Sequence, residues 1–128
     1  MIINIPEDLG LKPLPEGIYD ATITSVQLKQ SSTGKDMLQV EFTVTSGDHI
    51  GRKLFESYTC DDKVYWRHNL LFRACTSKDI PAGSYSIDEY LNLFTSSCLN
   101  KPVVIRVEAD VYEGQERNRV REVRKPNL

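Results

Sequence analysis

The segment from residue 17 to residue 30 changes the phase of its apolar alternation partway along, and this slip limits the folds open to the chain. Ala21 and Ile23 share one parity, whereas Val26 and Leu28 share the other. Successive side chains of a strand point to opposite faces of a sheet, so one extra residue, a β-bulge, is needed to keep both pairs on one face. Because a bulge bends its strand, we expect a long first strand that pairs on both sides of a closing sheet.

Four further segments have the alternation or the β-rich composition of strands. Residues 37–46 alternate most regularly, with Leu38, Val40, Phe42 and Val44 on one side. The other predicted strands are residues 52–59, 102–112 and 115–125. In segment 102–112 the residues expected to point inward are Val103, Ile105, Val107, Ala109 and Val111. Short turns join the first three strands, which predicts an antiparallel meander, and a turn at residues 113–114 joins the last two.

Between the third and fourth predicted strands the apolar spacing becomes helical. Asp61 and Asp62 are expected to cap a helix of three to four turns that ends before Ser77. Ser86 and Glu89 have the spacing of a capping box, which predicts a second, short helix.

The tryptophan and the two histidines are expected to be structural. Trp66 shares an apolar helix stripe with Leu70 and Ala74, so we expect it in the core. His49 is expected in a loop and His68 on the helix surface.

The order of predicted elements is strand, strand, strand, helix, strand, strand. This order matches the OB-fold, a small five-stranded Greek-key barrel, although a trimmed β-sandwich has the same strand count. The bent first strand favours closure, and the helix is placed to plug the open end of a barrel. We therefore expect an all-β fold with one or two short helices, an OB-fold domain at residues 17–125 with a helix between strands three and four. An extended, proline-rich arm at residues 1–16 precedes it, and a short tail at residues 126–128 follows.

The charge of the whole chain does not attract nucleic acid. Sixteen Lys and Arg residues stand against eighteen Asp and Glu residues, a formal net charge of −2. Residues 1–100 carry nine basic and thirteen acidic side chains (net −4), whereas residues 101–128 carry seven and five (net +2). Binding to a polyanion must therefore use local positive charge, which is concentrated near the C-terminal end.

The sequence contains no motif for catalysis, for a cofactor or for a tight metal site. It lacks a Gly-rich phosphate loop and the HExxH and GxSxG patterns. Cys60, His68 and Cys75 come nearest to a metal site, but they lack the paired close spacing of structural zinc ligands. We expect a protein that is not an enzyme and has no cofactor. Three cysteines, no secretory signal and no long apolar segment predict a cytoplasmic protein without membrane contact.

An OB barrel binds extended ligands across its second and third strands and the loops beside them. Cations that neutralise phosphates and rings that stack on bases favour an oligonucleotide over an oligosaccharide. The candidate nucleic-acid-binding residues are Lys29, Lys35, Arg52, Lys53, Phe55, Tyr58, Tyr112, Arg117, Arg119 and Arg121. The three arginines share one parity of the last strand with no carboxylate among them. Two simpler interpretations stay open: Phe55 and Tyr58 as core residues, and the arginines as charges that protect an edge strand.

Four segments, in their order and spacing, carry a resemblance to a known family: residues 14–21 (LPEGIYDA), 32–42 (STGKDMLQVEF), 51–55 (GRKLF) and 112–120 (YEGQERNRV). Over residues 14–123 the chain resembles the phage single-stranded-DNA-binding OB-fold proteins, long described as uncharacterised. The resemblance implies a protein that coats single-stranded DNA without sequence specificity during replication or recombination in the bacterial host cell. By position, the family's groove falls on Lys35, Arg52, Lys53, Phe55, Tyr112, Arg117 and Arg119. The basic end of this chain departs from the acidic tail by which many such proteins recruit replication enzymes.

The expected partners are single-stranded DNA, replication or recombination proteins, and further copies of the chain in a homodimer or a cooperative assembly. The alternative function is an OB-like protein-interaction module, an adaptor or an inhibitor of a host or phage protein. In that case the basic strand is an edge and the surface aromatics mark a protein interface. The net negative charge favours this alternative.

Overall fold

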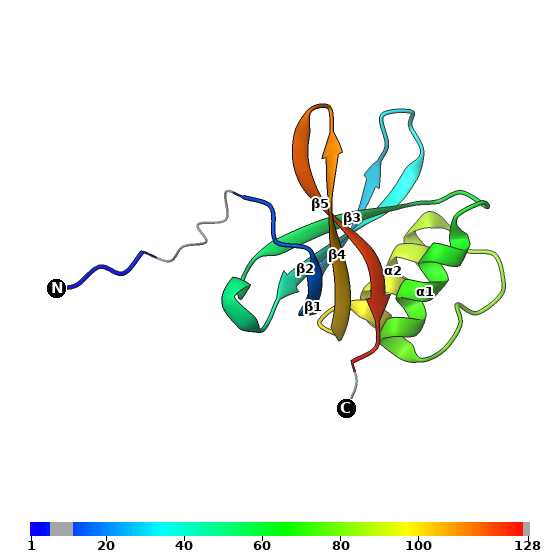
Figure 1. The fold of residues 1–128 in the computed structure, drawn as a ribbon. Coiled ribbons are helices and arrows are strands. Elements are labelled where there is room, and N and C mark those ends of the chain that lie inside the picture. The colour runs from blue at the N-terminus through cyan, green and yellow to red at the C-terminus, as the bar shows by residue number, and fades with distance from the viewer. Residues whose placement is uncertain (6–11, 127–128) are drawn as a thin grey trace.

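The computed structural model describes residues 1–5 and 12–126, which contain one five-stranded antiparallel sheet and two helices (Figure 1). The strands are β1 (Gly17–Gln30), β2 (Asp36–Val44), β3 (Lys53–Thr59), β4 (Pro102–Tyr112) and β5 (Gln115–Arg124), and the helices are α1 (Tyr65–Thr76) and α2 (Ile87–Cys98). A short 3₁₀ turn, Gly47–His49, lies between β2 and β3. The five predicted strands and the helical region between the third and fourth are confirmed. No helix of the described stretches is long and apolar enough to cross a membrane.

The bent first strand organises the sheet, whose order is β3-β2-β1-β4-β5. The beginning of β1 pairs with β4 from Gly17 to Thr22, and β1 pairs with β2 from Ala21 to Gln30. The pairing register with β2 shifts between Ile23 and Ser25, at the predicted bulge. One strand therefore joins the β2–β3 half of the sheet to the β4–β5 half, as the phase slip indicated.

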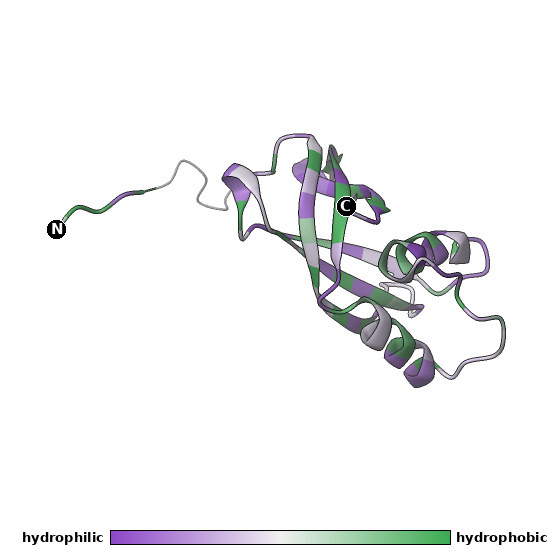
Figure 2. Cartoon of the chain, turned by 90° about the horizontal axis from the view of Figure 1, so that it is seen from below, coloured by the Kyte–Doolittle hydropathy of each residue, from purple (hydrophilic) through white to green (hydrophobic). Residues whose placement is uncertain are grey.

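The core lies between the sheet and the two helices, which sit side by side next to it in Figure 1. The predicted inward residues of β2 are all buried, and Figure 2 shows hydrophobic and hydrophilic residues alternating along the strands. The rings of Phe72 on α1 and Phe94 on α2 meet with their centroids 5.5 Å apart. Full burial of such a side chain stabilises a fold by about 1.5–3 kcal/mol.

The end of the predicted arm is part of this core. Leu14 is buried, its N–H donates to Oδ1 of Asn118 on β5 over 2.7 Å, and its carbonyl accepts from Nδ2 of Asn118 over 2.9 Å. Leu14 is therefore packed against the domain beside β5. Residues 6–11 of the predicted arm and residues 127–128 of the predicted tail lie outside the described residues.

The start of α1 differs from the prediction, whereas the start of α2 confirms it. The N-cap of α1 is Val64, which makes no side-chain capping bond, so the prediction that Asp61 and Asp62 cap this helix is wrong. The carboxylate of Asp61 instead accepts from the N–H of Lys63 over 3.0 Å. At α2 the side chain of Ser86 accepts from the N–H of Glu89 over 3.1 Å, as the capping box predicts.

Trp66 and His68 occupy the opposite environments from those predicted. His68 is fully buried, whereas Trp66 is 63% exposed. Side chains two positions apart in a helix point about 200° away from each other around the helix axis. The face of α1 that buries His68 and Phe72 is therefore opposite the face that carries Trp66 and Leu70. His68 tolerates burial because Nε2 donates to the carbonyl of Thr59 over 2.8 Å and Nδ1 lies 2.9 Å from the hydroxyl of Tyr90.

The end of β4 also departs from its predicted pattern. Val103, Ile105 and Val107 are buried as expected, but Ala109 and Val111 are exposed. Figure 1 shows the reason: the β4–β5 hairpin projects beyond the body of the domain. The turn at its tip has positive φ at residues 113 and 114, the geometry of a two-residue hairpin loop that matches the strand twist.

Candidate nucleic-acid interface

The β2–β3 half of the sheet has a solvent-facing side that is set by the parity of β3. Phe55 pairs with Glu41 of β2, and Lys53 pairs with Thr43. These four side chains point away from the core, since Leu54 and Phe42 between them are buried. Phe55 is 53% exposed and therefore is not a core residue. We call this side of β1, β2 and β3 the outer face.

Tyr58 belongs to the opposite parity of β3 and is only 3% exposed. The guanidinium of Arg67 lies over its ring, 4.5 Å from the centroid. Burial raises the pKa of the Tyr58 hydroxyl well above its usual range. Because α1 and its Arg67 cover this ring, Tyr58 is no longer a candidate for stacking on a base.

The three predicted lysines lie along or beside the outer face and differ in whether they form an ion pair. Lys29 pairs in register with Met37, is exposed, and has no ion pair among the described residues. Lys53 is exposed and lies 3.5 Å from the carboxylate of Glu41. Lys35, in the β1–β2 turn, donates to Asp61 over 2.6 Å. This bond raises the pKa of Lys35 and lowers that of Asp61.

Arg52 binds the end of the N-terminal arm. Its Nη2 donates to the carbonyl of Lys12 over 2.6 Å, two residues before the buried Leu14. We therefore assign to Arg52 a role in holding the end of the arm.

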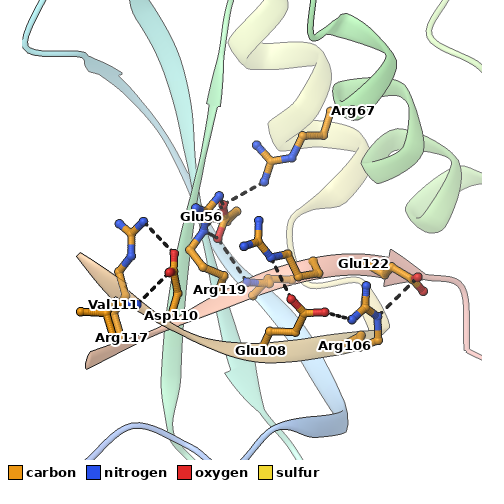
Figure 3. Close-up of polar contacts among 11 residues, drawn as sticks. Glu56, Arg67, Arg106, Glu108, Asp110, Val111, Arg117, Arg119 and Glu122 are labelled. Carbon is orange, nitrogen blue, oxygen red and sulfur yellow. Dashed lines mark hydrogen bonds and ion pairs between the residues drawn. The ribbon is translucent and has the colours of Figure 1, made fainter. Parts of the chain in front are cut away.

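Tyr112 and Arg117 form a stacked pair on the projecting β4–β5 hairpin. The ring of Tyr112 is exposed, and the guanidinium carbon of Arg117 lies 4.5 Å from its centroid. Arg117 also donates to Asp110 over 3.2 Å (Figure 3). The β4–β5 and β1–β2 hairpins project to the same side of the domain, with β3 crossing at their base (Figure 1).

The arginines of β5 are not free cations. Arg119 lies 2.7 Å from Glu56 of β3, and Arg121 lies 3.1 Å from Glu108 of β4. The side chains of Arg106 and Arg121 hold the pKa of Glu108 below its usual range, and the N–H of Val111 with Arg117 does the same for Asp110. The sequence showed no carboxylate among the β5 arginines, but the neighbouring strands supply them.

Glu56 is the buried charged residue that the sequence analysis missed. It is 4% exposed, and its carboxylate accepts from Arg67 over 2.8 Å, from Arg119 over 2.7 Å, and from the N–H of Val120 over 3.2 Å (Figure 3). These bonds connect β3 to β5, which are the two edges of the sheet. The signal was present, because Glu56 is a lone charge on the buried parity between Leu54 and Tyr58.

The cysteines and histidines do not assemble a metal site. Within the described residues no three His, Cys, Asp or Glu side chains are placed to hold a metal ion. Cys98 is buried, and Cys60 and Cys75 are half-buried. Burial raises the pKa of the Cys60 thiol, with Asp36 adding to the effect. The pKa of the Cys75 thiol is lowered, chiefly by its hydrogen bond with Cys98, with the charge of Lys101 adding to the effect.

Comparison with protein-family models identifies the family of the chain. A family model described as "Protein of unknown function (DUF669)" matches residues 5–127. No curated protein matches the chain.

Proposed function

We propose that this chain, which belongs to the DUF669 family of proteins of unknown function, is a single-stranded DNA-binding protein with an OB-type barrel. The sheet supports the barrel because its bent first strand joins both halves and its two edges, β3 and β5, are bridged through Glu56. A five-stranded barrel that is partly open has this form. The protein would coat single strands during phage replication or recombination, and it would do so without catalysis.

The observation that carries the proposal is the exposed ring of Phe55 on β3, on the outer face. An apolar ring left half in solvent on a rigid strand is a platform on which a base can stack, and such stacking contributes about 1–3 kcal/mol per base. Tyr112 offers a second exposed ring on the hairpin, already backed by Arg117. Stacking on these rings does not depend on base identity, because every base has a flat face.

Local cations supply the phosphate contacts. Lys29 and Lys53 are exposed on the outer face, and the exposed ion pair of Arg117 is weak enough to exchange Asp110 for a phosphate. Three phosphate contacts predict that the logarithm of the binding constant falls with the logarithm of salt concentration with a slope of about −2. The predicted role of Arg119 is different, since its guanidinium is committed to the buried Glu56.

Fluorescence anisotropy tests this proposal with a labelled oligo-dT and a matched duplex at low and high salt. We expect strand-selective binding that salt weakens. Phe55→Ala should weaken it about 5- to 150-fold, the equivalent of the stacking energy of one base. Ile18→Ala is the matched control, because Ile18 is an apolar residue at least as exposed as Phe55, at 63% against 53%, but it lies on the β1–β4 part of the sheet. Equal binding to duplex, or wild-type affinity of Phe55→Ala, would overturn the proposal.

A second candidate function, assembly with another copy of this chain, is favoured by the N-terminal segment. Met1, Ile2, Ile3 and Ile5 are all exposed, and together they form an apolar extended stretch. Deletion of residues 1–5 should then lower the apparent mass in sedimentation while the affinity for a short oligo-dT stays unchanged. A monomeric full-length chain would contradict this assembly.

A further inference from the structure

A pocket of about 920 Å³ lies beyond the outer face, where the β1–β2 turn meets the helices. One wall is the turn at residues 34–36, the second is the first part of α1 with Trp66 and Asn69, and the third is the α1–α2 loop at residues 79–85. This volume is within the range of pockets that hold small molecules. The pocket contains none of the stacking residues proposed above.

Four aromatic side chains line the pocket: Tyr65, Trp66, Tyr85 and Tyr90. The ring of Tyr90 makes edge contacts with Tyr65, at 6.3 Å between centroids, and with Tyr85, at 5.8 Å. Trp66 is the most exposed of the four. The lining therefore offers flat apolar surfaces at several angles, which suits a planar ring better than an aliphatic chain.

Hydrogen bonds hold the walls in place. The amide of Asn69 donates to Asp79 over 3.0 Å and accepts from the N–H of Ile80 over 2.8 Å, so the loop is fastened to α1. The hydroxyl of Tyr85 donates to the carbonyl of Pro81 over 2.6 Å. A pocket whose walls are fixed in this way loses little conformational entropy when it takes up a ligand.

The pocket lies next to one end of the outer face, on the helix side of the sheet. Lys29 pairs with Met37, Met37 pairs with Thr59, and the next N–H along β3, that of Cys60, donates to the carbonyl of Asp36 over 2.8 Å. Cys60 and Asp36 then line the pocket. Asp36 and Cys60 have the buried parity of Leu38 and Tyr58, so a strand of nucleic acid that follows the outer face past Lys29 reaches the pocket by turning around this end of the sheet.

The charges of the lining exclude a phosphate as the buried group. Asp36 and Asp79 outnumber Lys35, and Lys35 is paired with Asp61. We propose that the pocket takes one unstacked nucleobase of the bound single strand, while the phosphates remain outside along the lysines. This inference rests on the proposed function and adds a second base-binding site to it.

The tryptophan content of the chain makes the test direct, because Trp66 is its one tryptophan. In a single titration, anisotropy of a labelled oligo-dT reports binding and tryptophan emission reports the pocket. We expect Trp66 emission to fall with the same midpoint as the anisotropy change. Anisotropy without any change in emission would overturn the pocket inference and leave the proposed function intact. No anisotropy change would overturn both.

Two variants and one probe complete the experiment. Trp66→Ala should weaken oligo-dT binding about 5-fold or more, the lower end for one stacked base. Leu70→Ala, one turn along α1, removes an exposed apolar side chain outside the pocket and should bind as wild type. Inorganic polyphosphate, which has no bases, should not change Trp66 emission. The same emission change with polyphosphate, or equal effects of the two substitutions, would overturn the inference.

Discussion

Removing the carboxylate of Glu56 is the sharpest available test of how the two edges of the sheet, β3 and β5, are held together. In Glu56→Ala, the guanidinium of Arg119 and the N–H of Val120 lose the acceptor that ties β5 to β3. Arg67 keeps two partners, the carbonyl of Ser57 at 3.0 Å and the ring of Tyr58. The uncompensated groups therefore lie mainly on β5.

The expected loss of stability follows from the burial of these groups. Removing one partner of a buried ion pair costs about 3–5 kcal/mol, because the other charge stays desolvated. The side chains of Arg119 and Arg67 are 27% and 28% exposed, so water hydrates them in part after the substitution. We therefore expect the lower end, about 3 kcal/mol. For a chain of this length that corresponds to a melting temperature lower by about 10 °C.

Urea denaturation and thermal unfolding, both followed by circular dichroism, measure the effect. Glu122→Ala is the matched control: the Glu122 carboxylate also pairs with two arginines, Arg106 and Arg124, but it is exposed to solvent. Exposed pairs contribute about 0–1 kcal/mol, so this control should be nearly neutral. If Glu56→Ala loses no more stability than Glu122→Ala, the bridge between β3 and β5 does not hold the sheet and the reasoning is wrong.

Two further predictions concern the β5 arginines and the buried His68. Arg117→Ala should weaken oligo-dT binding, measured by anisotropy, and leave the melting temperature nearly unchanged. Arg119→Ala should instead lower the melting temperature in thermal unfolding, because it leaves the buried Glu56 with one ion-pair partner fewer. Burial, with a smaller contribution from the charge of Arg67, lowers the pKa of His68 below its ordinary 6.5, so below that pH the unfolded chain binds more protons than the folded one. Stability should fall by at most about 1.4 kcal/mol between about pH 7.5 and about pH 5.5, and His68→Gln should remove this dependence in urea denaturation. If His68→Gln shows the same dependence of stability on pH, then other titrating groups cause that dependence.

The parts of the fold that follow from local pattern were predictable from the sequence. The phase slip in β1 and the alternation in β2 depend only on which face of each strand is buried, and both were found as predicted. β3 was ambiguous because apolar residues occupy both of its parities, Leu54 and Tyr58 on one and Phe55 on the other. Only the neighbouring strand and helix decide which parity faces the core, and they bury Tyr58 and expose Phe55.

His68 and Trp66 show a second limit of sequence reasoning. Hydrophobicity favours burying tryptophan over histidine, and the prediction followed it. The structure buries His68 because Thr59 and Tyr90, which are distant in sequence, satisfy both ring nitrogens. Partners of this kind are invisible to periodicity, since they are brought together only by the packing of β3 and α2 against α1.

The β5 arginines differ in how firmly the fold holds them, which bears on the proposed binding of a polyanion. By their parity on β5 alone, the three arginines are equivalent cations. They differ in the structure because each pairs with a different carboxylate on β3 or β4. A phosphate that displaces Asp110 from Arg117 breaks an exposed pair of little energy, and the released carboxylate is hydrated at once. A phosphate that displaces Glu56 from Arg119 would leave a buried carboxylate short of a partner, at a cost that one phosphate contact does not offset. The fold therefore commits Arg119 to its own stability, and under the proposed function it leaves Arg117, Lys29 and Lys53 for contacts with phosphates.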